Sequence, residues 1–307
     1  MFFFLKGLGF LQSFFLNKVF FVILRTESIY NASIVENRNK LIYIDSVIKD
    51  FNPKLHKRLP RFVIRLIEKI IRQDKINRVL SLYGHLDGPE FIEAVFKDFN
   101  VDIIEHGAEN IEKGQRFMFV ANHPLGGLDG LAVIYSICKN FGHSRAIVND
   151  LLLFIESLKS VFCGVNVYGH NNEEIFKNIE ALYNNQEENI CAFPAGLVSR
   201  RVNGVITDLE WKSKFINMAT QHNLPIVPIY VDAKNSNFFY RTANIRKKLG
   251  IKFNYELVLL PGEVFKYHDK PINLYYGEPI MPQILKEIQT PAQRTQYVRQ
   301  MTYMLKP

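Results

Sequence analysis

The chain is organised around one segment, Ala121-Asn122-His123-Pro124-Leu125-Gly126-Gly127-Leu128-Asp129-Gly130. Before it lies an apolar run, Phe117 to Val120, which predicts a buried strand ending at Ala121. After it lies a second apolar run, Leu131 to Ile137, with helical spacing. A strand that turns sharply into a helix leaves its polar residues at the carboxyl edge of a sheet, where open α/β proteins bind ligands. The segment therefore predicts an α/β fold with a ligand site at this turn.

The polar residues of this segment include a potential acid–base pair. Gly126 and Gly127 allow the turn to double back, because glycine adopts backbone angles that a side chain forbids. We therefore expect His123 to meet Asp129 at the start of the helix, where a carboxylate is favoured. A neutral imidazole can take a proton from a hydroxyl, and a carboxylate on its other nitrogen fixes the tautomer. The pair predicts a general base acting directly on substrate; a chance pairing of His and Asp is the alternative.

A second informative segment is Pro194-Ala195-Gly196-Leu197-Val198-Ser199-Arg200-Arg201, which follows an expected strand from Asn189 to Phe193. Arginine holds phosphate or carboxylate through two parallel hydrogen bonds. If this strand ends at the same sheet edge as the first, Arg200 and Arg201 form an anion site opposite His123. Two solvated loop arginines with no ligand are the alternative.

The first segment resembles the first motif of the glycerolipid acyltransferase superfamily, the lysophosphatidic acid acyltransferase-like proteins. Asn122-His123 and Asp129 carry the resemblance, with five residues between His and Asp where the usual pattern has four. The text His-Pro-Leu-Gly-Gly-Leu-Asp-Gly is similar to a hemolysin-like subgroup that includes O-acyltransferases of ornithine and glycine lipid synthesis. The resemblance implies that His123 and Asp129 are catalytic and that Asn122, Gly126 and Gly127 bind substrate.

The second segment resembles the third motif of the same superfamily, Phe-Pro-Glu-Gly-Thr-Arg-Ser. Phe193, Pro194 and Gly196 match, whereas Ala195 stands where the glycerol phosphate enzymes have a Glu implicated in acceptor binding. The resemblance therefore implies a different acceptor head group. The candidate substrate-binding residues of this part of the chain are Pro194, Ala195, Gly196, Ser199, Arg200, Arg201 and Lys212.

Two further regions resemble the remaining motifs. A strand from Arg145 to Val148 leads into Asn149-Asp150, which corresponds to the second motif region and by resemblance lines the acceptor pocket. Turn and helix-cap chemistry explains Asn149-Asp150 equally well. Val227-Pro228-Ile229 resembles the fourth motif. The resemblance spans residues 40–285, with four motifs in order.

The resemblance implies a fold, an activity and a set of partners. The fold is α/β, a mostly parallel sheet flanked by helices, with an N-terminal helical membrane-contacting region at 1–99 and an acyltransferase domain at 100–307. The activity is transfer of a fatty acyl group from an acyl thioester to a lyso-lipid hydroxyl, with a lyso-ornithine or lyso-glycine lipid as the leading acceptor. The donor is a thioester of acyl carrier protein or coenzyme A, and neither a bound cofactor nor a metal is needed. Lysophosphatidic acid is the alternative acceptor, and a non-catalytic membrane-binding scaffold is the alternative of another class.

The composition suits an anionic partner. The 307 residues carry a formal net charge of +8, which favours nucleic acid, a membrane surface or a phosphorylated substrate. Residues 53–72 alone hold seven Lys or Arg against one Glu. We expect no nucleic acid partner, because no binding motif accompanies this charge. Cys138, Cys163 and Cys191 lie in apolar runs without metal-binding spacing and predict buried free thiols in a reducing compartment.

The N-terminal region predicts contact with a membrane. Residues 1–24 are mostly Phe, Leu, Val and Ile, interrupted by Lys6 and Lys18. We expect a helix lying in the interface on the cytoplasmic face; a spanning helix and a later translation start are alternatives. Residues 53–72 predict a basic amphipathic helix that binds a membrane surface or covers the main domain. Its apolar residues at helical spacing are Phe62, Val63, Leu66, Ile67, Ile70 and Ile71.

The remaining elements follow from periodicity and capping signals. The expected helices are 41–51, 128–141, 151–159 with Asp150 as N-cap, 172–183, a helix that begins near Thr207 and ends at His222, 238–249, and a last one with Thr290 as N-cap. The expected strands not yet named are 101–105, 161–168, 224–231, 253–260 and 272–276.

Overall fold

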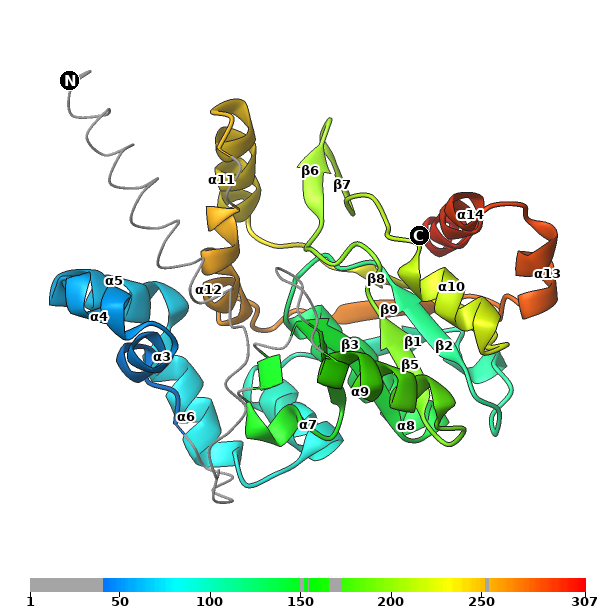
Figure 1. Cartoon of the computed structure of the whole chain (residues 1–307), viewed down its shortest axis with the longest axis horizontal. Helices are drawn as coiled ribbons and strands as arrows, with labels where there is room; N and C mark the ends of the chain where they lie inside the picture. Colours follow the sequence, from blue (N-terminus) through cyan, green and yellow to red (C-terminus); the bar gives the residue numbers. More distant parts are fainter. Residues whose placement is uncertain (1–40, 150–151, 154, 166–172, 252–253) are drawn as a thin grey trace.

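The computed structural model describes residues 41–149, 152–153, 155–165, 173–251 and 254–307, and shows a seven-stranded sheet with helices on both faces (Figure 1). The strands are β1 (Ile103–His106), β2 (Met118–Ala121), β3 (Ser144–Asn149), β4 (Phe162–Val165), β5 (Asn189–Ala192), β8 (Ile226–Asp232) and β9 (Ile272–Tyr276). Their order across the sheet is β1-β9-β8-β2-β5-β3-β4. All neighbouring pairs are parallel except β8 with β9. The expected mostly parallel sheet is confirmed.

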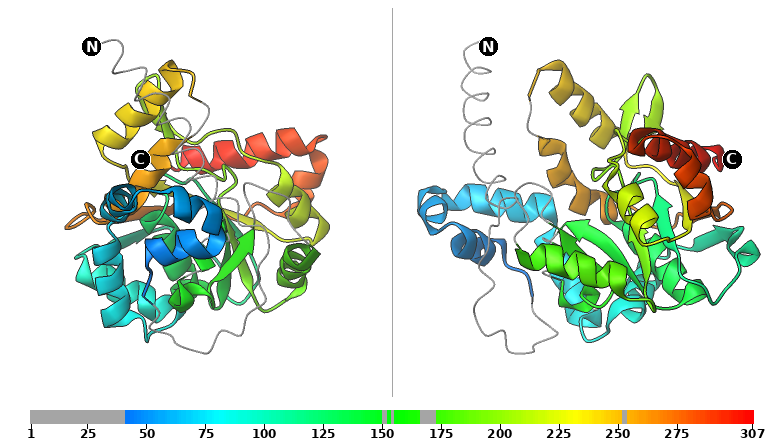
Figure 2. Two further views of the ribbon diagram at one scale, coloured as in Figure 1. Left: turned by 60° about the vertical axis from the view of Figure 1, so that its left-hand side comes forward. Right: turned by 45° about the vertical axis from the view of Figure 1, so that its right-hand side comes forward.

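Twelve α-helices surround this sheet within the described residues. They are α3 (Ile44–Phe51), α4 (Pro53–Arg58), α5 (Arg61–Ile71), α6 (Gln73–Tyr83), α7 (Gly88–Asp98), α8 (Leu128–Phe141), α9 (Glu173–Asn184), α10 (Lys214–Gln221), α11 (Asn237–Lys248), α12 (Leu260–Val264), α13 (Pro282–Glu287) and α14 (Pro291–Met304). Figure 2 shows the N-terminal helices, in blue, standing apart from the C-terminal helices, in red.

The central strand β2 shows why both faces of the sheet are covered. Its four residues are all buried, so the strand is apolar on both sides, as expected in a parallel sheet between helices. Phe119 and Ala121 belong to the core on the side of α7 and α8. Met118 and Val120 belong to the core on the side of α9 and α10. The strand order places β2 between β5 and β8, so that the turn after it lies near the middle of the sheet edge.

The N-terminal helices divide into two groups by their packing. Helix α7 shares the main core with the sheet through Phe91, Ile92 and Val95. Helices α3 and α5 instead pack on one another in a separate small cluster that includes Ile48 and Ile64. The boundary expected at residue 99 lies between α7 and β1, but α7 packs as part of the α/β body.

The apolar residues of α5 do not share one face of the helix, although the sequence predicts that they do. Ile64 and Ile67 are buried, whereas Phe62 and Leu66 are exposed on the opposite side. The apolar residues at 62–71 were expected on a single face; the structure divides them between two. Among the residues described, no helix has the length and apolar character to cross a membrane. The segment 1–24 lies outside the described residues.

Three other expected elements are wrong. Where a strand was expected at 253–260, the described residues form a 3₁₀ helix η5 (Tyr255–Leu259) followed by α12. Where a helix was expected at 151–159, the described residues contain the 3₁₀ turn η4 (Glu156–Leu158). The expected N-cap, Asp150, lies outside the described residues. The helix expected from Thr207 begins only at Lys214, the first residue of α10: Thr207 ends a hairpin of β6 (Arg200–Val202) and β7 (Val205–Thr207), and residues 208–213 join this hairpin to the helix. At the last helix, by contrast, Thr290 and Gln293 form the expected capping box.

Candidate active site

The site forms where two neighbouring strands end. β2 and β5 are parallel partners, with Val120 opposite Ala192, so the segments that follow them leave the sheet side by side. His123 lies two residues beyond β2, and Phe193 directly follows β5. Their ring centroids are 4.5 Å apart. The structure thus brings together the two segments that the sequence indicated.

His123 and Asp129 meet in the turn between β2 and α8. His123 Nδ1 lies 3.0 Å from Asp129 Oδ2, and the carboxylate is fully buried. The backbone N–H of Leu125 donates to Asp129 Oδ2 at 2.8 Å, and that of Gly130 donates to Oδ1 at 2.9 Å. Since the two N–H groups fix the carboxylate, the carboxylate can fix the imidazole. Nε2 lies on the side of the ring away from Asp129.

The two glycines of this turn have different reasons to be glycine. Gly126 has φ of +82°, a left-handed conformation, and a Cβ there would overlap with the side chain of Val198. Gly127 has no such backbone angle, but a Cβ would lie 3.1 Å from Val264 Cγ2. The turn therefore approaches both the β5 loop and α12 closely. Their place in substrate binding stays a prediction.

The electrostatics of the site favour a charged imidazole. Burial lowers the pKa of His123, but the neighbouring carboxylates of Asp129 and, to a smaller extent, Asp208 raise it more. The net pKa lies above the ordinary value of 6.5. A base with a raised pKa holds an abstracted proton more strongly, which suits the acceptance of a proton from a weakly acidic hydroxyl.

Asp208 is a residue that the sequence analysis missed. Its carboxylate accepts the backbone N–H of His123 at 3.2 Å, the hydroxyl of Ser199, and the indole N–H of Trp211 at 2.9 Å. Asp208 is buried, and burial raises its pKa although each of these donors lowers it. The residue was interpreted as part of a helix first turn; no local pattern indicated a contact with His123.

Two of the side chains predicted to bind substrate make hydrogen bonds within the protein instead. Asn122 Nδ2 donates to Val231 O at 3.0 Å and its Oδ1 accepts Val231 N at 2.6 Å, so the side chain joins the end of β2 to β8. Ser199 is buried, donates its hydroxyl to Asp208, and donates its backbone N–H to His123 O at 2.8 Å. Both residues therefore position the turn that contains His123.

Arg200 does not lie in the open anion site that the sequence predicted. Its Nη2 is 2.9 Å from Glu256 Oε1, and its side chain is only 8% exposed. Arg246 Nε lies 2.8 Å from the other oxygen of the same fully buried carboxylate. Burial lowers the pKa of Arg200, and the attraction of Glu256 opposes this. The guanidinium is thus committed to an internal ion pair.

Lys212 is the most accessible of the predicted cations. It is exposed, its backbone N–H donates to Pro194 O at 3.0 Å, and its Nζ lies 3.6 Å from where a Cβ on Gly196 would stand. Within the part of the chain that is described, its Nζ has no hydrogen bond or ion pair. Arg201 donates to Asn237 Oδ1 at 2.9 Å and lies over the ring of Tyr240.

The remaining predicted residues lie at the same edge without a free polar group. Ala195 is buried in the core below the loop, on the side of α10. Pro194 is buried and accepts from Lys212 through its carbonyl. Asn149 is the last residue of β3, half-buried and paired in register with Val165.

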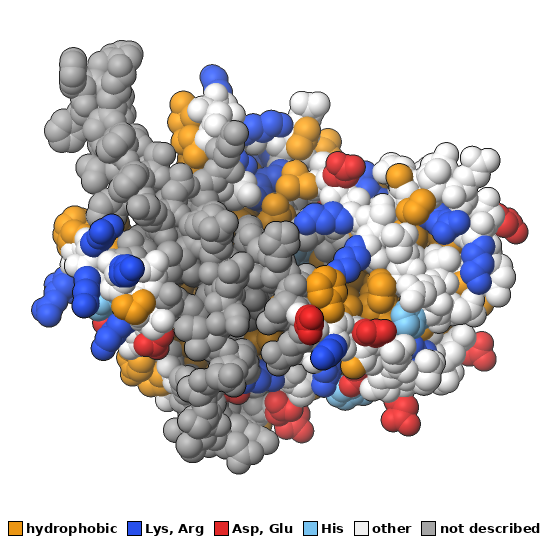
Figure 3. Space-filling view, in the orientation of Figure 1, with side chains coloured by type: hydrophobic (Ala, Val, Ile, Leu, Met, Phe, Trp, Pro, Cys, Tyr) orange, Lys and Arg blue, Asp and Glu red, His pale blue; other side chains and the backbone are white. Residues whose placement is uncertain are grey.

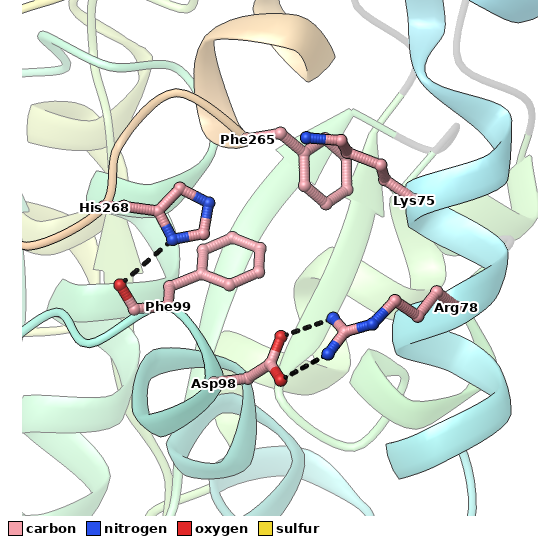
Figure 4. A pocket seen from close by; sticks show the side chains of 6 residues that line it. All are labelled: Lys75, Arg78, Asp98, Phe99, Phe265 and His268. Carbon is pink, nitrogen blue, oxygen red and sulfur yellow. Dashed lines mark hydrogen bonds and ion pairs between the residues drawn. The ribbon is translucent and has the colours of Figure 1, made fainter.

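A separate cavity of about 310 Å³ lies away from these residues, between α6, the end of α7 and the loop after α12 (Figure 4). Its lining residues are Lys75, Arg78, Asp98, Phe99, Phe265 and His268. Arg78 donates to both oxygens of Asp98, at 2.7 and 2.9 Å, so this carboxylate is not free to act as a base. The cavity does not include the His123–Asp129 pair.

A family model described as an acyltransferase matches residues 46–307. The chain belongs to this acyltransferase family. A lyso-glycine lipid O-acyltransferase of Bacteroides thetaiotaomicron is 38% identical over 266 residues, which are 86% of this chain and 97% of the relative. A protein of the same description from Phocaeicola vulgatus is 37% identical, over 86% of this chain and 95% of its own. Among solved structures, the 1-acyl-sn-glycerophosphate acyltransferase PlsC of Thermotoga maritima has a TM-score of 0.46 and 15% identity, and covers 97% of this chain and 90% of its own.

The family gives the geometry a chemical meaning. This acyltransferase carries a His–Asp pair at the carboxyl edge of its sheet, with the carboxylate buried and the imidazole 18% exposed. An imidazole with a fixed carboxylate on one side and access to solvent on the other can accept a proton from a hydroxyl.

Proposed function

We propose that this acyltransferase moves a fatty acyl group from an acyl thioester to the 3-hydroxyl of a lyso-glycine lipid. The observation that carries the proposal is the pairing of His123 Nδ1 with the buried Asp129, in a chain similar over most of its length to two lyso-glycine lipid O-acyltransferases. A lyso-ornithine lipid presents the same hydroxyl and belongs to the same class of acceptor.

His123 acts as the general base. Nε2 takes the proton of the acceptor hydroxyl, and the oxygen attacks the thioester carbonyl carbon. The tetrahedral intermediate collapses by breaking the carbon–sulfur bond, and the leaving thiolate takes the proton from His123. Asp129 stabilises the imidazolium between these steps. No covalent acyl-enzyme is needed. Backbone N–H groups near the turn stabilise the oxyanion.

The residues around Pro194 favour an acceptor with a carboxylate. Ala195 occupies the position where the glycerol phosphate enzymes are expected to have Glu. The carboxylate of a Glu there would repel the carboxylate of an amino-acid head group. Since Arg200 is paired with Glu256, the cations left for this head group are the exposed Lys212 and the half-buried Arg201. We assign the acceptor carboxylate to Lys212, with Arg201 beside it.

The acyl donor and the place of action follow as further parts of the proposal. A thioester of acyl carrier protein or of coenzyme A supplies the acyl group. The enzyme works on the cytoplasmic face of a membrane, held there from its N-terminal region. The basic residues of α4 and α5 support this placement, because exposed Lys and Arg attract anionic lipid.

The proposal is tested with the purified protein and two acceptors in one reaction. Lyso-glycine lipid and lysophosphatidic acid are supplied at equal concentration with an acyl carrier protein thioester, and the products are identified by mass spectrometry. We expect acylated glycine lipid as the main product. Preferential acylation of lysophosphatidic acid would refute the acceptor assignment. Acylation of neither lipid, by protein that is folded, would refute the proposed activity.

A further inference from the structure

A projection rises from the same sheet edge as His123. β5 leads into the β6–β7 hairpin and β8 leads into α11, and Figure 1 shows both standing above the sheet. The two elements pack on one another. Arg201 of the hairpin donates to Asn237 of α11 at 2.9 Å, and its guanidinium lies 4.9 Å from the centre of the Tyr240 ring. The hairpin and the helix therefore form one unit.

Buried charges hold this unit to the body of the enzyme. Glu256, in η5, is fully buried between Arg200 of β6 and Arg246 of α11, at 2.9 and 2.8 Å. Removing one partner of such a group leaves a buried charge without compensation, which is strongly unfavourable. The projection is thus fixed in its position relative to the catalytic turn.

The outer face of α11 is apolar and faces solvent. Phe238, Ile245 and Leu249 are spaced by seven and four residues, which places them on one side of the helix, and they are 59%, 56% and 66% exposed. The opposite side, with Phe239 and Tyr240, is fully buried. At the tip of the hairpin, Val202 and Val205 are also exposed. The projection therefore presents apolar side chains to solvent from both of its elements.

The same projection carries only positive charge. Residues 200–207 and 234–251 contain seven Lys or Arg and no Asp or Glu. Arg241 and Lys248 lie beside the apolar side chains on the helix, are exposed, and within the described ranges form no ion pair. Figure 3 shows basic and apolar side chains next to one another over α11 and β6. An apolar stripe bordered by unpaired cations is typical of a surface that lies on anionic lipid.

We infer that the outer face of α11 and the tip of the β6–β7 hairpin dock on the surface of an anionic bilayer. Phe238, Ile245 and Leu249 enter the interface, while Arg241 and Lys248 beside them meet lipid phosphates. Because the projection starts at the sheet edge that carries His123, docking holds the catalytic turn next to the leaflet. This surface is separate from the N-terminal region, and its docking does not depend on which acceptor is acylated.

Binding of the full-length protein to vesicles tests this surface. The probe is sedimentation with vesicles of equimolar phosphatidylcholine and phosphatidylglycerol, against vesicles of phosphatidylcholine alone. Replacing Arg241 and Lys248 by Gln should weaken binding to the anionic vesicles on the order of 25-fold, since each cation near such a leaflet contributes about a factor of five. Ile245→Ser with Leu249→Ser should weaken binding to both vesicles by more than about tenfold.

Matched controls carry the same changes elsewhere. Lys139 of α8 and Lys177 of α9 are exposed, and their replacement by Gln should change binding less than about twofold. Leu82→Ser with Met304→Ser is the apolar control. Thermal unfolding verifies that each variant is folded. Wild-type binding by both α11 variants, or an equal loss in the controls, would overturn the inference.

A second readout separates this inference from the proposed function. Acyl transfer to an acceptor embedded in vesicles should fall with vesicle binding in the α11 variants. Transfer to a water-soluble short-chain acceptor should stay at the wild-type level, because none of the changed residues lies in the catalytic turn. An equal fall on both acceptors would contradict docking. A wild-type protein that acylates neither acceptor would refute the proposed function, while the vesicle-binding result would still decide the docking surface.

Discussion

The carboxylate of Asp208 accepts the backbone N–H of His123, which lies 85 residues earlier in the chain, at 3.2 Å. The same carboxylate accepts the Ser199 hydroxyl and the Trp211 indole N–H. Ser199 in turn donates its backbone N–H to the carbonyl of His123. One buried acid therefore joins the loops after β2 and β5, and the position of His123, the proposed base, depends on a residue outside the His–Asp pair.

His123→Ala should lower kcat/KM at least about a hundredfold, because it removes the proton acceptor itself. Asp129→Asn should lower it less, since the base remains but loses the group that orients it. Both are measured with a thioester donor and a lyso-lipid acceptor, alongside thermal unfolding. Full activity in a folded His123→Ala protein would refute the mechanism.

The activity should rise with pH through an apparent pKa above 6.5, because only neutral His123 can accept a proton and its pKa is raised by Asp129 and Asp208. The contribution of His123 to the free energy of unfolding changes with pH in the opposite direction to the activity. A raised pKa means that the folded state favours the protonated imidazole, so this contribution is full below pH 6.5 and is lost as pH rises through the folded pKa. Asp129→Asn should move the acid limb of the kcat/KM profile to lower pH. An unchanged limb would show that another group is titrating.

Asp208→Asn should lower both stability and activity. The amide can still accept from His123 and Ser199 through Oδ1, but its NH₂ then faces the indole N–H of Trp211, another donor. A buried donor left unpaired costs about 1–3 kcal/mol. Urea unfolding measures the stability. The double variant with Trp211→Phe should recover part of the loss, and a lack of any recovery would contradict this geometry.

Gly126→Ala should destabilise the enzyme more than Gly114→Ala. Both glycines have positive φ, +82° and +89°, so each substitution has a backbone cost of about 1–2 kcal/mol. Only at Gly126 would the new methyl group also overlap with Val198, whereas nothing lies within 4 Å of a Cβ at Gly114. Adding Val198→Ala should relieve part of the Gly126→Ala effect in urea unfolding. Equal losses at the two glycines would contradict the close approach.

Arg200→Ala and Lys212→Ala should have different effects, because Arg200 stabilises the fold whereas Lys212 is proposed to bind the acceptor. Arg200→Ala leaves Glu256 buried with one partner fewer, which should cost about 3–5 kcal/mol of unfolding free energy. Lys212→Ala should raise KM for the lyso-glycine lipid about tenfold with little change in the unfolding midpoint, because Lys212 is exposed. A Lys212→Ala protein with unchanged KM would remove this residue from acceptor binding.

The parts of the site that could be predicted are those set by local pattern. His123 and Asp129 belong to one strand–turn–helix segment, so glycine chemistry and helix-start preference were enough to predict their meeting. Asp208 could not be found in this way, because its contact with His123 depends on how two distant loops fold over the sheet edge. The sequence predicts Arg200 in an anion-binding site and cannot show its ion pair for the same reason: its partner Glu256 is 56 residues away.

Two errors in the fold had different causes. The β6–β7 hairpin was missed although Asn203-Gly204, flanked by Val202 and Val205, is a strong signal for a two-residue hairpin turn; both residues have positive φ. The apolar run at 253–260 was interpreted as a strand because short apolar runs do not distinguish a strand from a buried helical turn by periodicity alone. Its described part is held as η5 and α12 by contacts with α5 and α11.

The strand order has a consequence for the chain while it is being synthesised. β2, which is buried on both faces, is made before its neighbours β5 and β8, so the edge that pairs with β8 stays open until Asp232 has left the ribosome. Unpaired apolar strands promote aggregation. We expect nascent chains that stop before β8 to need chaperone protection and to lack the completed catalytic turn.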